Sequence, residues 1–241
     1  MSIVYIISAP SGSGKSSIVA GILRLVPNLE FSISYTTRQP RGSEKDGREY
    51  FFVSVPEFEK MIRNNEFLEY ATVFGDGGDY YGTARRFLIE AEQHGRDLLL
   101  DIDVQGAEQV KRRLPAAVSI FVLPPDRATL ERRLRNRGSD SEAKICRRLV
   151  TASGEIENYE KYDYILVNDR LEESIDDLKA IVLARRLASS GKPLSEADNG
   201  VLQAADRFRL ENTRDRVKPI VASFMSQAQP CGRNEFGGDN Q

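Results

Sequence analysis

Four short hydrophobic runs along the chain show no alternation of polar and apolar positions. They are rich in valine, isoleucine and leucine, and they cover residues 3–7, 97–103, 118–123 and 163–169. Strands that are covered on both faces have such continuous apolar sequences, whereas strands with one wet face alternate. The pattern therefore predicts a buried parallel sheet.

Segments with the spacing of amphipathic helices separate these runs, and several of them end at glycine or proline. They cover residues 15–25, 84–94, 105–113, 126–137 and 171–188. A regular alternation of strands and helices is typical of an α/β fold, in which helices flank a parallel sheet.

Two stretches interrupt this alternation and are predicted to be inserted modules. Residues 31–83 carry patches of period two around an expected helix at 57–64, which opens with a capping-box pattern from Ser54 to Glu57. This is a small, mixed, mostly β module. Residues 132–162 are helical in pattern and rich in arginine around a Gly/Ser/Asp turn, as expected of a lid. The core would then comprise residues 1–30, 84–131 and 163–188.

The composition changes at the end of the last predicted helix. Residues 189–241 are rich in serine, glycine, asparagine, aspartate and glutamine, and only 201–208 have weak helical periodicity. Such a composition buries little apolar surface. The sequence therefore predicts a flexible C-terminal extension.

The overall composition excludes some classes of function. The 241 residues include 34 basic and 36 acidic side chains, so no global charge favours nucleic acid or an anionic membrane. The arginine-rich lid also lacks the interleaved aromatics of a nucleic-acid surface. No apolar run approaches the roughly 18 residues of a membrane span, and no signal peptide is recognisable. We expect a cytoplasmic protein without nucleic-acid or membrane partners, and the sequence leaves its oligomeric state open.

A glycine-rich loop, "APSGSGKS", connects the first predicted strand to the first predicted helix. It matches the P-loop pattern, with Ala9 where the strict pattern has glycine. The backbone N–H groups of such a loop cradle phosphates, and the helix N-terminus adds a partial positive charge. Lys15 would reach the β and γ phosphates, and the Ser16 hydroxyl would bind Mg²⁺. Asp101, at the end of a buried strand, is a second candidate metal ligand. The residues of the loop predicted to bind ATP are Ala9, Pro10, Ser11, Gly12, Ser13, Gly14, Lys15, Ser16 and Ser17.

The insertion at 31–83 carries groups that suit a nucleoside monophosphate. Arg38 and Arg41, followed by Tyr50, could form a fork for a phosphate, although an arginine pair is as often only a solvated surface. Guanine presents its N1–H and N2 amino group as adjacent donors and O6 as an acceptor, so a carboxylate and a hydroxyl complement it. Adenine would set a lone pair against that carboxylate. The candidate carboxylates are Glu69 and Asp103, and the candidate hydroxyls are Ser34 and Thr83.

Eight stretches of the chain resemble guanylate kinases and follow that family's order from residue 3 to residue 188. They are "SAPSGSGKSS", "SYTTRQPRGSEKDGREYFFVS", "FLEYATVFG", "YYGT", "LLLDIDVQGA", "IFVLPP", "RRLRNRGSDSE" and "YDYILVND". The resemblance implies a P-loop parallel sheet with a GMP-binding insertion and a lid. It also implies transfer of the γ-phosphoryl group of ATP to GMP, and to dGMP, with the help of Mg²⁺.

The resemblance further implies a role for each matching residue. The guanine base would contact Ser34, Glu69, Thr83 and Asp103, and the GMP phosphate would contact Arg38, Arg41, Tyr50 and Tyr81. Arg133, Arg137 and Arg148 resemble lid arginines that close over the phosphates being exchanged. The catalytic residues expected from this comparison are Lys15, Arg38, Arg133, Arg137 and Arg148. Asn168 matches a position near the adenine of ATP, and Asp101 one near the magnesium shell.

The chain departs from the family pattern before the tyrosines of "YYGT". The stretch "FGDGGDYYGT" stands where the family usually has "FGNYYGT", and the longer turn could shift Tyr81 and Thr83. Two other functions stay open at this stage. One is an inactive, protein-binding scaffold, which would have no need of Lys15 and Ser16; the other is a kinase for another mononucleotide, which Glu69 disfavours.

Overall fold

The computed structural model describes residues 2–73, 78–136, 138 and 140–225. The strands are β1 (Val4–Ser8), β2 (Leu29–Ser32), β3 (Tyr35–Thr36), β4 (Phe51–Phe52), β5 (Phe67–Val73), β6 (Asp79–Ala84), β7 (Asp97–Asp101), β8 (Val118–Leu123) and β9 (Tyr164–Val167). The α-helices are α1 (Lys15–Leu25), α2 (Val55–Arg63), α3 (Arg85–Gln93), α4 (Val104–Arg113), α5 (Arg127–Asn136), α6 (Glu142–Ile156), α7 (Leu171–Ser190), α8 (Glu196–Asp206) and α9 (Leu210–Met225).

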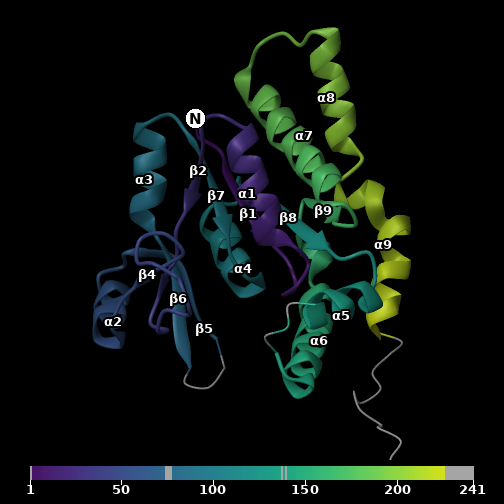
Figure 1. Cartoon of the computed structure of the whole chain (residues 1–241). Coiled ribbons are helices and arrows are strands. Elements are labelled where there is room, and N and C mark those ends of the chain that lie inside the picture. Colours follow the sequence, from purple (N-terminus) through teal and green to yellow (C-terminus); the bar gives the residue numbers. More distant parts are fainter. Residues whose placement is uncertain (1, 74–77, 137, 139, 226–241) are drawn as a thin grey trace, which may run out of the picture.

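A five-stranded parallel sheet with the order β2-β7-β1-β8-β9 forms the centre of the molecule (Figure 1). This sheet, flanked by helices, confirms the predicted α/β class. All its strands end at the same edge, and the mixed sheet and the helices α5 and α6 lie toward that end. One expectation was wrong: Leu29–Ser32, of which all but the first two residues were assigned to the insertion, pairs in parallel with β7. The inserted module therefore begins after Ser32.

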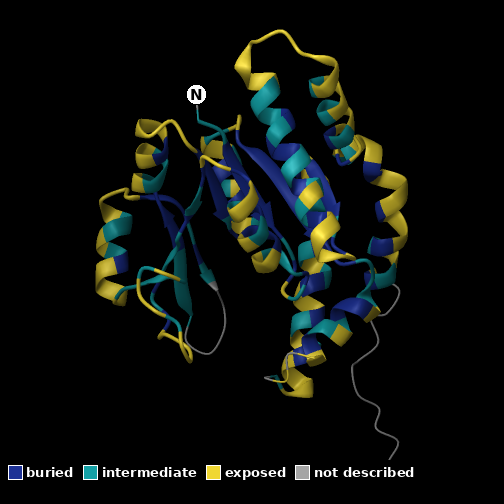
Figure 2. Ribbon diagram, turned by 45° about the horizontal axis from the view of Figure 1, so that its top comes forward, coloured by how far each residue is buried: buried dark blue, intermediate teal, exposed yellow. Residues whose placement is uncertain are grey.

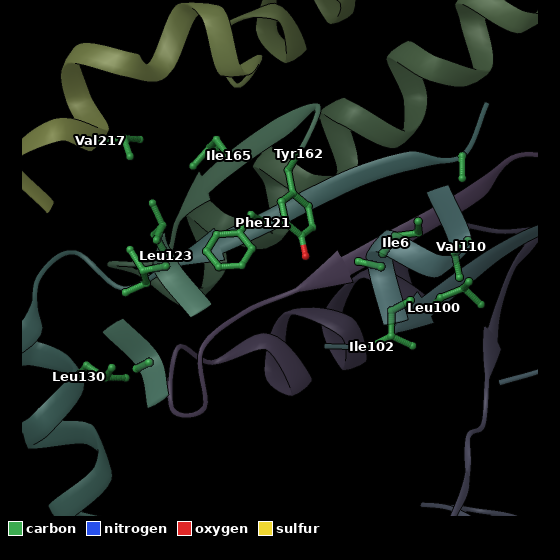
Figure 3. Close-up of a cluster of buried hydrophobic side chains, with 14 of the residues drawn as sticks. Ile6, Leu100, Ile102, Val110, Phe121, Leu123, Leu130, Tyr162, Ile165 and Val217 are labelled. Carbon is green, nitrogen blue, oxygen red and sulfur yellow. The ribbon is translucent and has the colours of Figure 1, made fainter. Parts of the chain in front are cut away.

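Helices cover both faces of the parallel sheet, which explains why its strands lack polar alternation. On one face, Tyr5 and Ile7 of β1 pack in a cluster with the apolar side chains of α1 and α7. On the other, Ile6 packs with Val110 of α4 and with side chains of α5, α6 and α9. Figure 3 shows part of this second cluster, around Phe121. The sheet is buried between these layers, and the exposed residues lie mostly on the outer sides of the helices (Figure 2).

The inserted module is a mixed sheet with the order β4-β3-β6-β5, with α2 beside it. As the capping-box pattern predicted, the Ser54 hydroxyl accepts a hydrogen bond from the Glu57 N–H at 3.3 Å, and α2 begins there. Phe58 anchors the helix, because its ring stacks on the rings of Phe67 and Tyr80 with centroid distances of 4.3 and 5.1 Å. The module thus has a small aromatic core of its own.

The C-terminal part of the chain was expected to be flexible, but the structure shows two helices there. Residues 196–225 form α8 and α9, and α9 buries Val217, Ile220 and Phe224 in the cluster that α5 and α6 share. The three side chains recur at i, i+3 and i+7, a helical spacing that the polar average composition of the tail conceals. Residues 226–241 lie outside the described residues.

The chain between α8 and α9 also covers an edge of the central sheet. The Ile165 N–H donates to the Phe208 carbonyl at 2.8 Å, and the Leu210 N–H donates to the Asp163 carbonyl at 3.1 Å. These bonds satisfy backbone groups on β9, which is the last strand of the sheet and would otherwise present an open edge. Within the described part of the chain, no helix is long and apolar enough to cross a membrane.

Candidate active site

The loop between β1 and α1 has backbone conformations that require glycine. Gly12 and Gly14 have φ angles of 99° and 90°, in the left-handed region that side chains rarely adopt. A Cβ atom on Gly14 would also lie 2.2 Å from the Asn168 Nδ2. The loop closes through a bond from the Ser13 N–H to the Pro10 carbonyl at 3.1 Å. A tight loop of this kind at a helix N-terminus is a suitable anion site.

Asn168 supports this loop from behind. Its Nδ2 donates to the Ser13 carbonyl at 2.6 Å, and its Oδ1 accepts from the Ser174 hydroxyl at 3.1 Å. The residue is 4% exposed, and its own N–H donates to the Leu123 carbonyl. The sequence comparison placed Asn168 near the adenine. In the structure both ends of its amide are engaged by the protein, so Asn168 positions the P-loop, and Ser174 was missed by the sequence analysis.

Lys15 and Asp101 meet at the ends of the adjacent strands β1 and β7. The Lys15 Nζ forms an ion pair with the Asp101 carboxylate and lies 3.4 Å from the Ile102 carbonyl. Ser16, in the first turn of α1, is exposed. Among the described residues there is no cluster of three His, Cys, Asp or Glu side chains that could hold a metal. Mg²⁺ at nucleotide sites usually takes one or two protein oxygens together with phosphates and water, and Ser16 and Asp101 fit such a donor set.

A cavity of about 260 Å³ lies next to Lys15, between the strand ends of the parallel sheet and the mixed sheet. Its walls bring together predicted site residues from distant parts of the chain. They are Lys15, Ser34, Tyr50, Glu69, Tyr81, Asp101 and Asp103. Lys15 of the predicted phosphate loop and three of the four predicted guanine-binding residues therefore line one space, whereas Thr83 is not among the lining residues.

Glu69 is the most deeply buried carboxylate of this cavity, with 4% exposure. Burial raises its pKa to about 7; Thr83, its cross-strand neighbour on β6, partly offsets this, and the negative charge of Asp103 adds to it. Space beside the carboxylate exists only because residue 106 is glycine, where a Cβ would lie 2.6 Å from the Glu69 Oε2. Such a buried carboxyl group gains most from a ligand that donates hydrogen bonds to it.

Asp103 has a structural partner as well as a place in the cavity wall. It caps the N-terminus of α4, where its Oδ1 accepts from the Gly106 N–H at 2.8 Å. This bond fixes one oxygen of the carboxylate, and the other oxygen has no hydrogen-bond partner among the described residues.

Arg38 is 7% exposed and is held by groups of the inserted module. Its guanidinium forms two hydrogen bonds with the Glu44 carboxylate, at 2.8 and 3.1 Å, and its Nε donates to the Tyr81 hydroxyl at 3.0 Å. The Tyr50 ring lies 5.2 Å from the guanidinium carbon. These contacts, chiefly the bonds to Glu44, raise the pKa of Arg38 and keep it ionised. The sequence analysis missed Glu44, which no motif marks.

Arg41 does not join this group in the structure. It is exposed, and its backbone N–H donates to the Glu44 carboxylate at 2.8 Å. Neither Arg38 nor Arg41 is among the residues that line the cavity, whereas Tyr50 and Tyr81, which contact Arg38, are. Glu44 therefore binds both arginines, with Arg38 buried and Arg41 exposed.

Beyond the longer turn before "YYGT", β5 and β6 pair in one register from Val73 and Asp79 as far as Glu69 and Thr83, and the register shifts between Glu69 and Phe67. Residues 74–77 of this turn lie outside the described residues. On β6, Tyr81 pairs with Ala71, and Thr83 pairs with Glu69. Both residues are thus held in the sheet. Tyr81 contacts Arg38, and Thr83 lies opposite Glu69, as the family resemblance grouped them.

Two of the three predicted lid arginines are described, and they have different surroundings. The Arg133 Nη2 donates to the Asp169 carbonyl at 3.1 Å, whereas its Nη1 is buried without a hydrogen-bond partner among the described residues. Burial lowers the pKa of Arg133. Arg148 is bound to the Asp140 carboxylate at 2.6 Å. Arg137 lies outside the described residues.

The lid helices also contact the P-loop through residues that the sequence analysis missed. A Cβ on Gly12 would lie 2.9 Å from atoms of both Leu130 and Leu134, so α5 packs directly on the loop. On α6, burial raises the pKa of Glu155 to about 7, while the nearby Lys15 and the Ser11 N–H act in the opposite direction. Both observations tie the lid to the phosphate loop.

The P-loop, the polar cavity beside it and the arginine-bearing helices together define a P-loop kinase. The sequence profile described as guanylate kinase matches residues 1–185. A guanylate kinase of Koribacter versatilis (strain Ellin345) is 54% identical over 230 residues, which cover 94% of this chain and 97% of the relative. That of Escherichia coli (strain K12) is 48% identical over 189 residues, which cover 78% of this chain and 90% of the relative.

A solved structure agrees with these sequence relatives. The crystal structure of guanylate kinase from Anaplasma phagocytophilum aligns with a TM-score of 0.63 at 31% identity, and the alignment covers 86% of this chain and 97% of that chain. The present chain therefore belongs to the guanylate kinase family, whose members are ATP:GMP phosphotransferases.

Proposed function

We propose that this chain transfers the γ-phosphoryl group of ATP to GMP, and also to dGMP, with Mg²⁺ as cofactor. The single observation that carries the proposal is the shared cavity: Lys15 of the P-loop lines the same 260 Å³ as Glu69 and Asp103. A phosphate donor on the loop and a guanine nucleotide in the cavity would thus face each other. The cytoplasm, where both nucleotides are available, is the compartment that we propose.

The P-loop would hold the donor. Its backbone N–H groups and Lys15 would bind the phosphates of ATP, and the ion pair of Lys15 with Asp101 would rearrange when the γ-phosphate arrives. Bound Mg²⁺ would supply charge neutralisation on the donor phosphates. Ser16 and Asp101 are the side chains proposed to hold it, directly or through water.

The inserted module would hold the acceptor. Arg38 contacts Tyr50 and Tyr81, and these two tyrosines line the cavity, so the three residues would together receive the GMP phosphate. Arg41 would have to turn inward to join them, and its position next to Pro40 at the surface allows this only with movement of the bend that Glu44 holds. The Arg38 guanidinium would exchange Glu44 for phosphate oxygens, because both bind it bidentately.

The base would be recognised at the other end of the cavity. Ionised Glu69 would accept from the guanine N1–H and N2 amino group, and the hydroxyls of Ser34 and Thr83 with the carboxylate of Asp103 would complete its hydrogen bonds. Adenine lacks the N1 donor, so it would leave Glu69 buried and unpaired. None of these proposed contacts involves the ribose 2′-hydroxyl, which is why dGMP is included.

The lid would complete the site during transfer. In-line transfer needs the two polyanions close together and water excluded. The Arg133 Nη1, which has no hydrogen-bond partner among the described residues, would bind an oxygen of the transferring phosphoryl group. Arg137 and Arg148 are proposed to close over the same group, which requires Arg148 to leave Asp140.

A coupled assay of ADP formation tests the proposal. ATP·Mg²⁺ is offered with GMP, dGMP, AMP, CMP or UMP in turn, and we expect turnover with GMP and dGMP far above the other three. The Lys15→Ala variant serves as the control for contaminating kinases. Turnover with none of the monophosphates would favour the scaffold function, and faster turnover with AMP than with GMP would refute the base contacts assigned to Glu69.

A further inference from the structure

A second hollow lies in the C-terminal part of the chain, apart from the catalytic cavity. Its volume is about 650 Å³, and it is formed by α7, β9, α8 and the connection from α8 to α9. Its floor is apolar and well packed: Tyr164, Ala184 and Ala205 are 4%, 4% and 2% exposed. None of its lining residues belongs to the P-loop, the inserted module or the lid. The hollow therefore has no part in the proposed transfer.

The rim of the hollow is cationic. Three arginines line it, Arg185, Arg207 and Arg209, and the single acidic residue in its lining is Asp206. Asp206 is already engaged, because its carboxylate accepts from the Arg209 Nε at 2.8 Å. Arg207 has the carboxylate of Asp177 on α7 nearby, outside the lining. Arg185 alone of the three arginines is thus left without an ion-pair partner among the described residues, and an anion would supply its counter-charge.

Arg185 adds an unsatisfied donor. Its Nε is buried and has no hydrogen-bond partner among the described residues. Leaving a buried donor unpaired costs about 1–3 kcal/mol, so such an atom is expected to have a partner in the working state of the protein. The neighbouring Arg186 contrasts with it, since its Nε donates to the Asp97 carboxylate at 2.7 Å.

The other two arginines are held in place by aromatic rings and by the backbone. The Arg207 guanidinium lies 5.6 Å from the centre of the Phe208 ring, and the Arg209 guanidinium lies 5.8 Å from that of Tyr164. An antiparallel bridge also fixes Arg209 opposite Tyr164 on β9. Cationic groups fixed before binding lose less conformational entropy when a ligand arrives.

The size and the floor decide what kind of anion fits. A volume of 650 Å³ is much larger than one phosphate group needs and lies within the range of small-molecule sites. An apolar floor beside arginines suits a molecule with a flat ring and a phosphate tail, because the ring covers Ala184 and Ala205 while guanidinium groups bind the phosphate. We propose that this hollow is a second nucleotide site, which binds a nucleoside phosphate independently of catalysis.

Isothermal titration of the full chain with ADP tests this site. The catalytic cavity is first filled with a bisubstrate analogue in which adenosine and guanosine are joined through five phosphates. We expect one further ADP to bind per chain. Arg185→Gln should weaken this event by about tenfold, as expected for one lost charge-assisted hydrogen bond. Arg24→Gln, which removes the same charge from an exposed position of α1, should leave it unchanged.

A second variant distinguishes a binding site of defined shape from nonspecific electrostatic attraction. Ala188, on α7, also lines the hollow, and Ala188→Phe would place a ring in the space proposed for the base while every charge is kept. We expect this variant to lose the further ADP and to keep the wild-type melting temperature. The proposal is overturned if the wild-type chain binds no further ADP, if Arg24→Gln weakens binding as much as Arg185→Gln, or if Ala188→Phe still binds. If pyrophosphate bound as tightly as ADP, the hollow would recognise phosphate groups alone, and the proposal that it binds a nucleotide would be refuted.

Discussion

Glu69→Gln should stabilise the fold at pH 8 while it weakens the binding of guanine. Glu69 is 4% exposed, and burial raises its pKa to about 7 from an ordinary value of 4.5. Folding therefore favours the protonated carboxyl group, whereas guanine recognition needs the ionised one. Glutamine keeps the size of the side chain and removes the charge, so the two requirements can be measured separately.

The pKa difference sets the size of the effect. It corresponds to about 3 kcal/mol against the ionised form in the folded chain. A carboxyl group whose pKa is raised by folding makes its full contribution to stability when the pH is below its pKa in the unfolded chain. That contribution is lost as the pH rises through its pKa in the folded chain, here between pH 4.5 and pH 7. Glu69→Gln should thus raise the free energy of unfolding by up to about 3 kcal/mol at pH 8, and by less than about 1 kcal/mol at pH 5.

Urea unfolding at the two pH values measures this stability. Binding of guanosine measures recognition of the base, because guanosine has no phosphate group whose own titration would change the affinity. Wild-type affinity for guanosine should fall about tenfold from pH 8 to pH 6, as Glu69 becomes protonated, and the variant should bind weakly at both. Glu59→Gln, on α2, where the side chain is half-exposed and lies 4.0 Å from the Arg63 guanidinium, is the matched control. The reasoning would be refuted if Glu69→Gln changed the free energy of unfolding equally at pH 5 and pH 8. It would also be refuted if the affinity for guanosine had the same pH dependence in the variant as in the wild type.

Three further predictions concern the loop, the lid and the C-terminal helix. Asn168→Ala should lower the free energy of unfolding by about 1–3 kcal/mol, because it leaves Ser13 and Ser174 without their buried partner; an unchanged urea midpoint would contradict this. Arg133→Ala should lower kcat by about 10³-fold with little change in the KM for GMP, and equal losses in both constants would argue for a binding role instead. Phe224→Ala should cost about 3 kcal/mol in urea unfolding, as for other buried aromatic side chains, and a near-neutral result would mean that α9 is not part of the cooperative core.

Much of the fold follows from patterns within short segments of the chain. The apolar runs without alternation predicted the parallel strands, and the capping-box pattern at Ser54 predicted the start of α2. Such patterns succeed because a strand that will be covered on both faces needs consecutive apolar residues, and a helix cap needs residues three positions apart, so both signals lie within a short segment. The helix α9 escaped prediction because the apolar side chains that it buries, Val217, Ile220 and Phe224, are spread among polar ones, and only packing against α5 and α6 makes them a face.

The candidate site also contains some residues that the sequence predicted and others that only the structure identifies. The P-loop is a contiguous motif, so its residues could be named one by one. In contrast, the sequence contains nothing to indicate that Glu44 binds Arg38, that Asn168 supports the loop, or that Arg41 stays outside the cavity. Each of these depends on which backbone or side-chain groups the folded chain brings within hydrogen-bonding distance.

The sequence by itself determined the phosphate loop, the class of fold and the family resemblance, because these depend on local periodicity and on contiguous motifs. Only the tertiary structure decided that Glu69 would be buried beside Asp103 in the same cavity as Lys15, and that the C-terminal helices would close a second hollow. The physical reason is that burial and charge are properties of a place in the fold. A carboxylate acquires a pKa of about 7 from what surrounds it, and those neighbours come from strands and helices far apart along the chain.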